Sequence, residues 1–172
     1  MVRIRGDVTG MIVKQIVDED FVNYKKPSMF IAFPNCDWKC EKECGMRVCQ
    51  NSALATSPDI EIDVEKIVAR YLNNPLTSAI VIGGLEPFYD YRDLLYLIQH
   101  IRFSGCKDDI VIYTGYTEEE CKSRCYIFDL LKYKNIIIKF GRFIPNQEPH
   151  YDEVLGVALA SDNQYAKKIV GD

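Results

Sequence analysis

The chain has 172 residues, of which 48% are hydrophobic and 27% charged, with a formal net charge of −4. A chain of this length can bury roughly 70% of its unfolded surface, so we expect one domain over residues 1–172. The dispersed basic residues argue against a nucleic-acid-binding protein, and neither a secretory signal nor a run of ~18 apolar residues is present. We therefore expect a cytoplasmic protein that binds neither nucleic acid nor membranes.

Four short apolar runs, rich in β-branched and aromatic residues, predict strands at 28–33, 79–82, 109–113 and 135–138. Their nearly continuous apolarity is typical of strands that are buried on both faces, as in a parallel sheet.

Helical patterns lie between these strands. Apolar residues at helical spacing follow Asp63 and Asp90, each a possible N-cap, and predict two helices that cover the sheet. A third helix is expected to open with a capping box between Thr117 and Glu120 and to run to about residue 132. On that helix Cys121, Cys125 and Phe128 would share a face toward the core.

Alternating strands and helices with right-handed crossovers predict an α/β fold, either a doubly wound sheet or an incomplete barrel. In both architectures sites lie at the carboxyl ends of the strands. A cysteine-rich segment, the pair Gly83-Gly84 and the pair Thr114-Gly115 each follow a predicted strand. We therefore expect these three segments to meet on one rim.

Four cysteines occur within fourteen residues: Cys36, Cys40, Cys44 and Cys49. Such density indicates a soft-metal site, and the odd total of seven cysteines makes a disulfide framework the weaker explanation. Four thiolates would form a closed structural zinc site, as in a non-enzymatic interaction module. Three would hold an iron–sulfur cluster with one iron open to a ligand. The spacing alone leaves both alternatives open.

The glycine pair would allow a ligand or another backbone to approach closely, and Glu86 would add a carboxylate to the same rim. This carboxylate is a candidate site for a cationic amino group. A tight turn with a solvated glutamate is the alternative.

Together these motifs resemble the radical S-adenosylmethionine enzymes, and among them the activating enzymes of anaerobic ribonucleotide reductases. The similarity extends over about residues 29–169. It is carried by Cys-x3-Cys with a later Cys-x-Asn, by Gly-Gly followed by Glu-Pro, by Ile-Tyr-Thr-Gly-Tyr-Thr at 112–117, by Gly-Arg-Phe at 141–143 and by Ser-Asp-Asn-Gln at 161–164.

The resemblance implies an incomplete (β/α) barrel of the radical S-adenosylmethionine type. It also implies a 4Fe-4S cluster that binds and reductively cleaves S-adenosylmethionine, with no catalytic residue beyond the cluster. The radical would be transferred to a glycine of the large subunit of an anaerobic ribonucleotide reductase, with an electron donor such as flavodoxin or ferredoxin. A radical S-adenosylmethionine enzyme acting on a small molecule is the alternative within this family.

By the same resemblance the cluster ligands are Cys36, Cys40 and Cys49, with Cys44 as the alternative third ligand. The positions implied in cofactor binding are Val48, Cys49, Gln50, Gly83, Gly84, Glu86, Thr114 and Gly115. The chain departs from the family pattern in three places: the long spacing before Cys49, the extra Leu85 after the glycines, and Phe140 where the family commonly has Asp.

Overall fold

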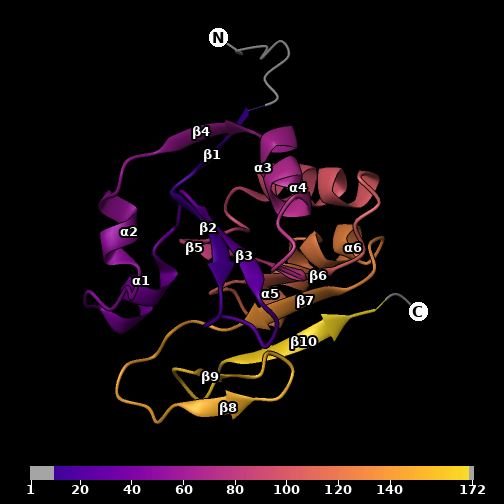
Figure 1. Ribbon diagram of the computed structural model, residues 1–172. Helices are drawn as coiled ribbons and strands as arrows, with labels where there is room; N and C mark the ends of the chain where they lie inside the picture. The colour runs from indigo at the N-terminus through magenta and orange to yellow at the C-terminus, as the bar shows by residue number, and fades with distance from the viewer. Residues whose placement is uncertain (1–9, 171–172) are drawn as a thin grey trace.

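The computed structural model describes residues 10–170, and a six-stranded sheet of order β10-β7-β6-β5-β3-β2 forms its centre (Figure 1). The strands are β2 (Gln15–Asp20), β3 (Ser28–Phe33), β5 (Ala79–Gly84), β6 (Asp109–Tyr113), β7 (Ile136–Phe140) and β10 (Tyr165–Ile169). The four inner strands are parallel, whereas β2 and β10 pair antiparallel at the two edges. The parallel sheet is thus confirmed, and the sequence analysis missed its edge strands, which are only partly apolar.

Four further strands form two small sheets. β1 (Gly10–Val13) pairs with β4 (Ile60–Asp63), and β8 (His150–Asp152) forms a hairpin with β9 (Val157–Leu159). Two short helices, α1 (Lys39–Cys44) and α2 (Ser52–Thr56), occupy the segment between β3 and β4. In Figure 1 they lie at the left, whereas the helices α3 (Val64–Leu72) and α4 (Tyr91–Phe103) lie at the right.

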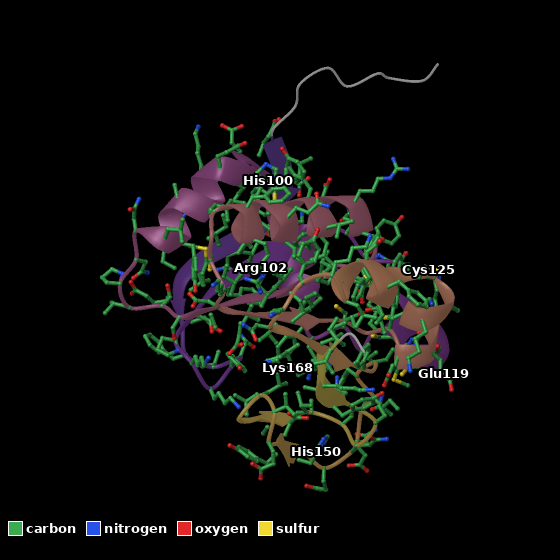
Figure 2. The ribbon with its side chains drawn as sticks, turned by 90° about the vertical axis from the view of Figure 1, so that its right-hand side faces the viewer. His100, Arg102, Glu119, Cys125, His150 and Lys168 are labelled. Carbon is green, nitrogen blue, oxygen red and sulfur yellow. The ribbon has the colours of Figure 1, made fainter. Side chains whose placement is uncertain are left out.

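The predicted third helix is wrong in its length. It is divided into α5 (Glu118–Ser123) and α6 (Tyr126–Leu130), because Cys125 adopts a left-handed conformation with φ of 61°. The ring of Tyr126 stacks on that of Tyr91 with centroids 4.3 Å apart, and this contact favours the break over a continuous helix. Only Cys121 faces the core, whereas Cys125 and Phe128 are exposed, and Figure 2 shows Cys125 at the outer edge of the molecule. The capping box itself is confirmed.

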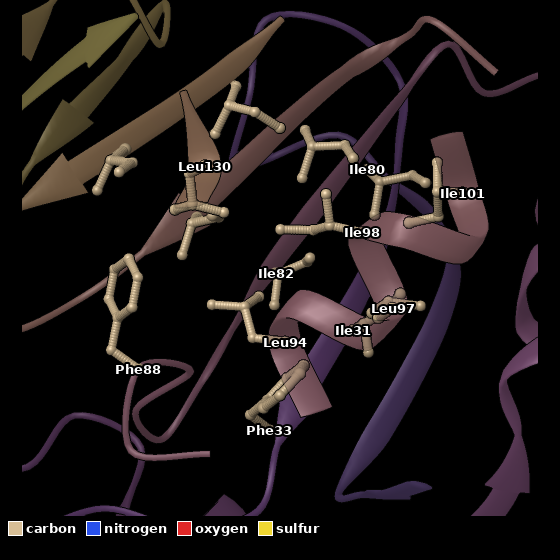
Figure 3. Close-up of a cluster of buried hydrophobic side chains, with 14 of the residues drawn as sticks. Ile31, Phe33, Ile80, Ile82, Phe88, Leu94, Leu97, Ile98, Ile101 and Leu130 are labelled. Carbon is tan, nitrogen blue, oxygen red and sulfur yellow. The ribbon is translucent and has the colours of Figure 1, made fainter. Parts of the chain in front are cut away.

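Helices cover one face of the sheet. Figure 3 shows α4 with Leu94, Leu97 and Ile98 packed against Ile80 and Ile82 of β5, and all five side chains are almost completely buried. Burial of a side chain of this size contributes about 1.5–3 kcal/mol, so this layer is a major source of stability. Residues of α3, α5 and α6 belong to the same core.

The opposite face carries a second core, whose members come from strands and loops. Val81, Val111 and Ile137 point to this face because successive residues of a strand alternate, and Leu155 and Leu159 of the β8–β9 hairpin pack on them. The doubly wound alternative is therefore wrong. Strands β3, β5, β6 and β7 follow one another in chain order, so right-handed crossovers put the packed helices α3, α4, α5 and α6 on the same side.

The described sheet is open, with β2 at one end of the strand order and β10 at the other. It is a mixed α/β architecture in which one face of the sheet remains free of helices. Within residues 10–170 no helix is long and apolar enough to span a membrane.

Candidate functional site

A cavity of about 280 Å³ lies at the carboxyl ends of the parallel strands. Its walls include Phe30 of β3, Tyr113 of β6 and Lys139 of β7, which share the helix-free face of the sheet. The three segments expected on one rim do meet here. All eight positions implied in cofactor binding line the cavity: Val48, Cys49, Gln50, Gly83, Gly84, Glu86, Thr114 and Gly115.

Three of the four clustered cysteines also line this cavity, namely Cys36, Cys40 and Cys49. Cys44, the last residue of α1, is not among the lining residues. Burial raises the pKa of Cys36 to about 12 and raises that of Cys40, so both thiols hold their protons in the metal-free chain. A metal that binds them must displace these protons.

The cysteines do not converge on a single ion. Among residues 10–170 no group of three or more His, Cys, Asp or Glu side chains is placed to hold one metal ion. An iron–sulfur cluster spreads its iron atoms over a larger volume, so its thiolate ligands surround a space rather than a point. Three soft sulfur donors around one cavity fit such a cluster. The choice between Cys44 and Cys49 as third ligand remains a prediction.

Contacts with the glycine turn and with the loop after β6 fix the cysteine segment. The Asn51 side-chain amide donates to the carbonyl of Gly84 at 2.7 Å, and the hydroxyl of buried Tyr116 donates to Asp37 at 2.9 Å. Gly84 itself has φ of 89°, and a Cβ there would lie 2.8 Å from the Cα of Ala32. Only glycine allows the two strands to approach so closely.

Glu86 is almost completely buried, at 2% exposure, in spite of the extra Leu85 before it. Its Oε1 accepts hydrogen bonds from the Thr114 hydroxyl at 2.8 Å and the Phe88 N–H at 3.0 Å, and its Oε2 accepts one from the Gly115 N–H at 2.8 Å. The solvated-glutamate alternative is therefore wrong. Burial raises the pKa of this carboxyl to about 7, although the three hydrogen bonds oppose the shift.

Lys139 is the functional candidate that the sequence analysis missed. It interrupts the apolar run of β7 and is buried, with its ammonium donating to the carbonyl of Gly141 at 2.8 Å. Burial lowers the pKa of Lys139 to about 8, with opposing attraction from Glu86 and Cys40. The sequence does contain a signal for Lys139, namely a charged residue inside an apolar strand, because lysine is almost never buried without a specific reason.

The two histidines take no part in this site. Figure 2 shows His100 on α4 and His150 on the β8–β9 hairpin at opposite ends of the molecule, and neither lines the cavity.

Comparisons with known proteins agree with the sulfur-rich cavity. Residues 27–164 match the family described as 4Fe-4S single cluster domain, and this match includes the cysteine segment and all the cavity residues named above. Comparisons with curated proteins and with solved structures found no match. Because the family match covers well over half of the chain, this protein belongs to the 4Fe-4S single cluster domain family.

Proposed function

We propose that this protein is a radical S-adenosylmethionine activating enzyme that generates a glycyl radical on an anaerobic ribonucleotide reductase. The observation that carries the proposal is the union, in one cavity, of three cysteine thiols with a buried acid, Glu86, and a buried base, Lys139. The family match to a 4Fe-4S cluster domain supports the cluster part of the proposal.

The paired charges suit the amino-acid end of S-adenosylmethionine. A carboxylate has about four lone-pair sites, and Glu86 uses three of them within the chain, so Oε2 keeps capacity for an ammonium group. Lys139 has three N–H donors and gives one to Gly141, so it retains donors for a carboxylate. An ammonium and a carboxylate on one ligand would satisfy both buried charges, which are otherwise costly.

The glycines and the cysteine segment would shape the remaining contacts. Gly83 and Gly115 present bare backbone to the cavity, so a cofactor can approach the main chain closely. Cys36, Cys40 and Cys49 would hold the cluster, and Val48 and Gln50 would flank the cofactor. When bound, a cluster of this type would supply the electron that cleaves the sulfonium of S-adenosylmethionine, and the hydrogen atom would come from a glycine of the partner. The fold would then correspond to an incomplete radical S-adenosylmethionine barrel.

The partner in this proposal is the large subunit of an anaerobic ribonucleotide reductase, and the electron donor is a protein such as flavodoxin or ferredoxin. The cavity is not fully enclosed, so a segment of a protein partner would reach it from the surface.

The test is anaerobic reconstitution with iron and sulfide, followed by reduction and quantification of 5′-deoxyadenosine and methionine. The unsubstituted protein should cleave S-adenosylmethionine, and Cys36→Ala should not. Mixing with an anaerobic reductase should then produce a glycyl-radical signal in electron paramagnetic resonance. A cluster-loaded protein that leaves S-adenosylmethionine intact would refute the proposal, as would one zinc per chain without sulfide.

A second candidate function is radical chemistry on a small molecule. A further cavity of about 620 Å³ adjoins the first, and the two share Asn23, Phe30, Gln50 and Asn51. A volume of this size accommodates a small-molecule substrate. Cleavage of S-adenosylmethionine without any glycyl radical on a reductase, but with hydrogen transfer to a small molecule, would favour this second function.

A further inference from the structure

Arg142 follows β7 and is buried, at 7% exposure, beside the cavity. Its Nη2 donates to Oε1 of Glu120 at 2.6 Å, and its Nε lies 3.1 Å from Oε1 of Glu43. Glu120 belongs to α5, and Glu43 belongs to α1, the helix that carries Cys40 and Cys44. One guanidinium therefore connects the cysteine helix to the body of the protein.

A second cation completes this arrangement. Lys39, the first residue of α1, donates to the same Oε1 of Glu120 at 2.7 Å. Burial opposes the charge of Glu120, but the hydrogen bonds from Arg142 and Lys39 outweigh it and lower the pKa of this carboxyl to about 2. The carboxylate is thus ionised at neutral pH and anchors α1 at its first turn, and exposed Glu43 adds an ion pair near the end of α1 without a hydrogen bond from Nε.

Hydrogen bonds from residues 161–164 also fix the main chain at Gly141 and Arg142. The Asn163 amide and the Ser161 hydroxyl donate to its carbonyl at 2.8 and 3.4 Å, and the Gln164 amide donates to the carbonyl of Gly141 at 3.3 Å. Gly141 has φ of 101°, and a Cβ there would lie 2.9 Å from the carbonyl oxygen of Asn163. The segments 141–143 and 161–164, distant in sequence, form one rigid support for the guanidinium.

The same side chain lies next to a candidate cluster ligand. A Cβ added to Gly115 would lie 3.7 Å from Sγ of Cys40 and 3.8 Å from Cγ of Arg142, so the two side chains flank one point of the cavity wall. A fixed positive charge near a thiolate stabilises the anion, and groups around a cluster tune its reduction potential.

We propose that Arg142 is a positioning residue that holds the cysteine helix α1 on the cavity rim and stabilises the bound cluster through its permanent charge. The inference requires the 4Fe-4S cluster of the family but not the radical chemistry proposed above. Two effects follow from it: removal of the guanidinium should loosen the cluster, and it should make the reduction potential more negative, because reduction adds negative charge.

The experiment compares Arg142→Gln with Arg92→Gln, which removes the same charge from an exposed position on α4. Both proteins are loaded anaerobically, and iron release to a chelator and the midpoint potential are measured without S-adenosylmethionine. We expect Arg142→Gln to release iron about 10- to 100-fold faster, the range typical of lost supporting contacts around a metal ligand. Its midpoint potential should shift to a more negative value, and that of Arg92→Gln should not.

Two further variants keep the inference testable if Arg142→Gln fails to fold, as judged by circular dichroism. Arg142→Lys keeps the charge but cannot reach two carboxylates as a planar fork, so iron release should accelerate while the potential changes little. Glu120→Gln weakens the anchor of α1 and should also accelerate iron release. If a folded Arg142→Gln protein retains iron as long as Arg92→Gln does, the positioning role is refuted. If Arg142→Gln does not fold, the same result for both Arg142→Lys and Glu120→Gln refutes it. An unchanged potential in a folded Arg142→Gln protein would refute the electrostatic part.

Discussion

The buried carboxyl of Glu86 makes the stability of the cluster-free protein depend on pH in a specific way. Its pKa is raised from 4.5 to about 7 by burial. At pH 5 the folded chain therefore keeps a proton that the unfolded chain has largely lost, and this proton stabilises the fold. The contribution disappears as the pH rises through 7, because the folded state must then bury a charge.

The magnitude follows from the two pKa values. Between pH 5 and pH 8 the free energy of unfolding should fall by about 2–3 kcal/mol through this one group. Glu86→Gln replaces the carboxyl with an amide that does not titrate, so it should remove this part of the pH dependence. The absolute stability of the variant also changes, since an amide cannot accept from Thr114, Phe88 and Gly115 all together. The informative quantity is therefore the slope with pH.

The assay is urea unfolding of the cluster-free protein under reducing, anaerobic conditions at several pH values from 5 to 8. Far-ultraviolet circular dichroism and the fluorescence of Trp38, the single tryptophan, provide two independent signals. Glu148→Gln, at an exposed position between β7 and β8, is the matched control for the loss of one carboxylate.

The unsubstituted protein and Glu148→Gln should become less stable relative to Glu86→Gln by about 2–3 kcal/mol as the pH rises from 5 to 8. Parallel pH profiles for all three proteins would refute the reasoning, since they would mean that the carboxyl is ionised in the fold at no cost.

Three other predictions concern the same region. Cys49→Ala should prevent retention of the cluster after reconstitution, whereas Cys44→Ala should not, because Cys49 lines the cavity and Cys44 does not. The measurement is iron and sulfide analysis of the reconstituted proteins. The reverse result would make Cys44 the third ligand. Gly84→Ala should lower the free energy of unfolding by about 3 kcal/mol or more, and Gly105→Ala by about 1 kcal/mol: both glycines have positive φ, but only a Cβ at Gly84 would overlap the backbone of β3. Equal losses in urea unfolding would contradict this. Lys139→Met should weaken equilibrium binding of S-adenosylmethionine to the cluster-loaded protein by about 10-fold or more, because a charged hydrogen bond is lost. Unchanged affinity would exclude a contact between Lys139 and the carboxylate of the ligand.

The elements with the clearest patterns were predictable from sequence. The strand 109–113 has its expected bounds, and the helix expected after Asp63 begins at Val64, because continuous apolar runs and 3.6-residue periodicity reflect burial directly. The third helix was not predictable beyond its capping box. Its break at Cys125 depends on aromatic stacking of Tyr126 with Tyr91, whose positions are 35 residues apart.

The candidate site was predictable where its residues are close in sequence or follow strand ends. Gly84, Glu86 and Gly115 meet because parallel strands end at one edge of a sheet. Lys139 and Arg142 were not predictable as members of the site. The place of Lys139 in the site depends on which face of β7 its side chain occupies, and that of Arg142 depends on its contacts with α1 and α5.

The sequence by itself determined the four inner strands, the two main helices and the sulfur-rich segment, since each of these depends on neighbouring residues and on their periodicity. Only the tertiary structure decided that α3, α4, α5 and α6 cover the same face, that Cys44 lies off the cavity, and that Lys139 and Arg142 lie beside Cys40. These outcomes depend on strand order and on contacts such as that of Lys39 with Glu120, 81 positions apart, for which local sequence carries no signal.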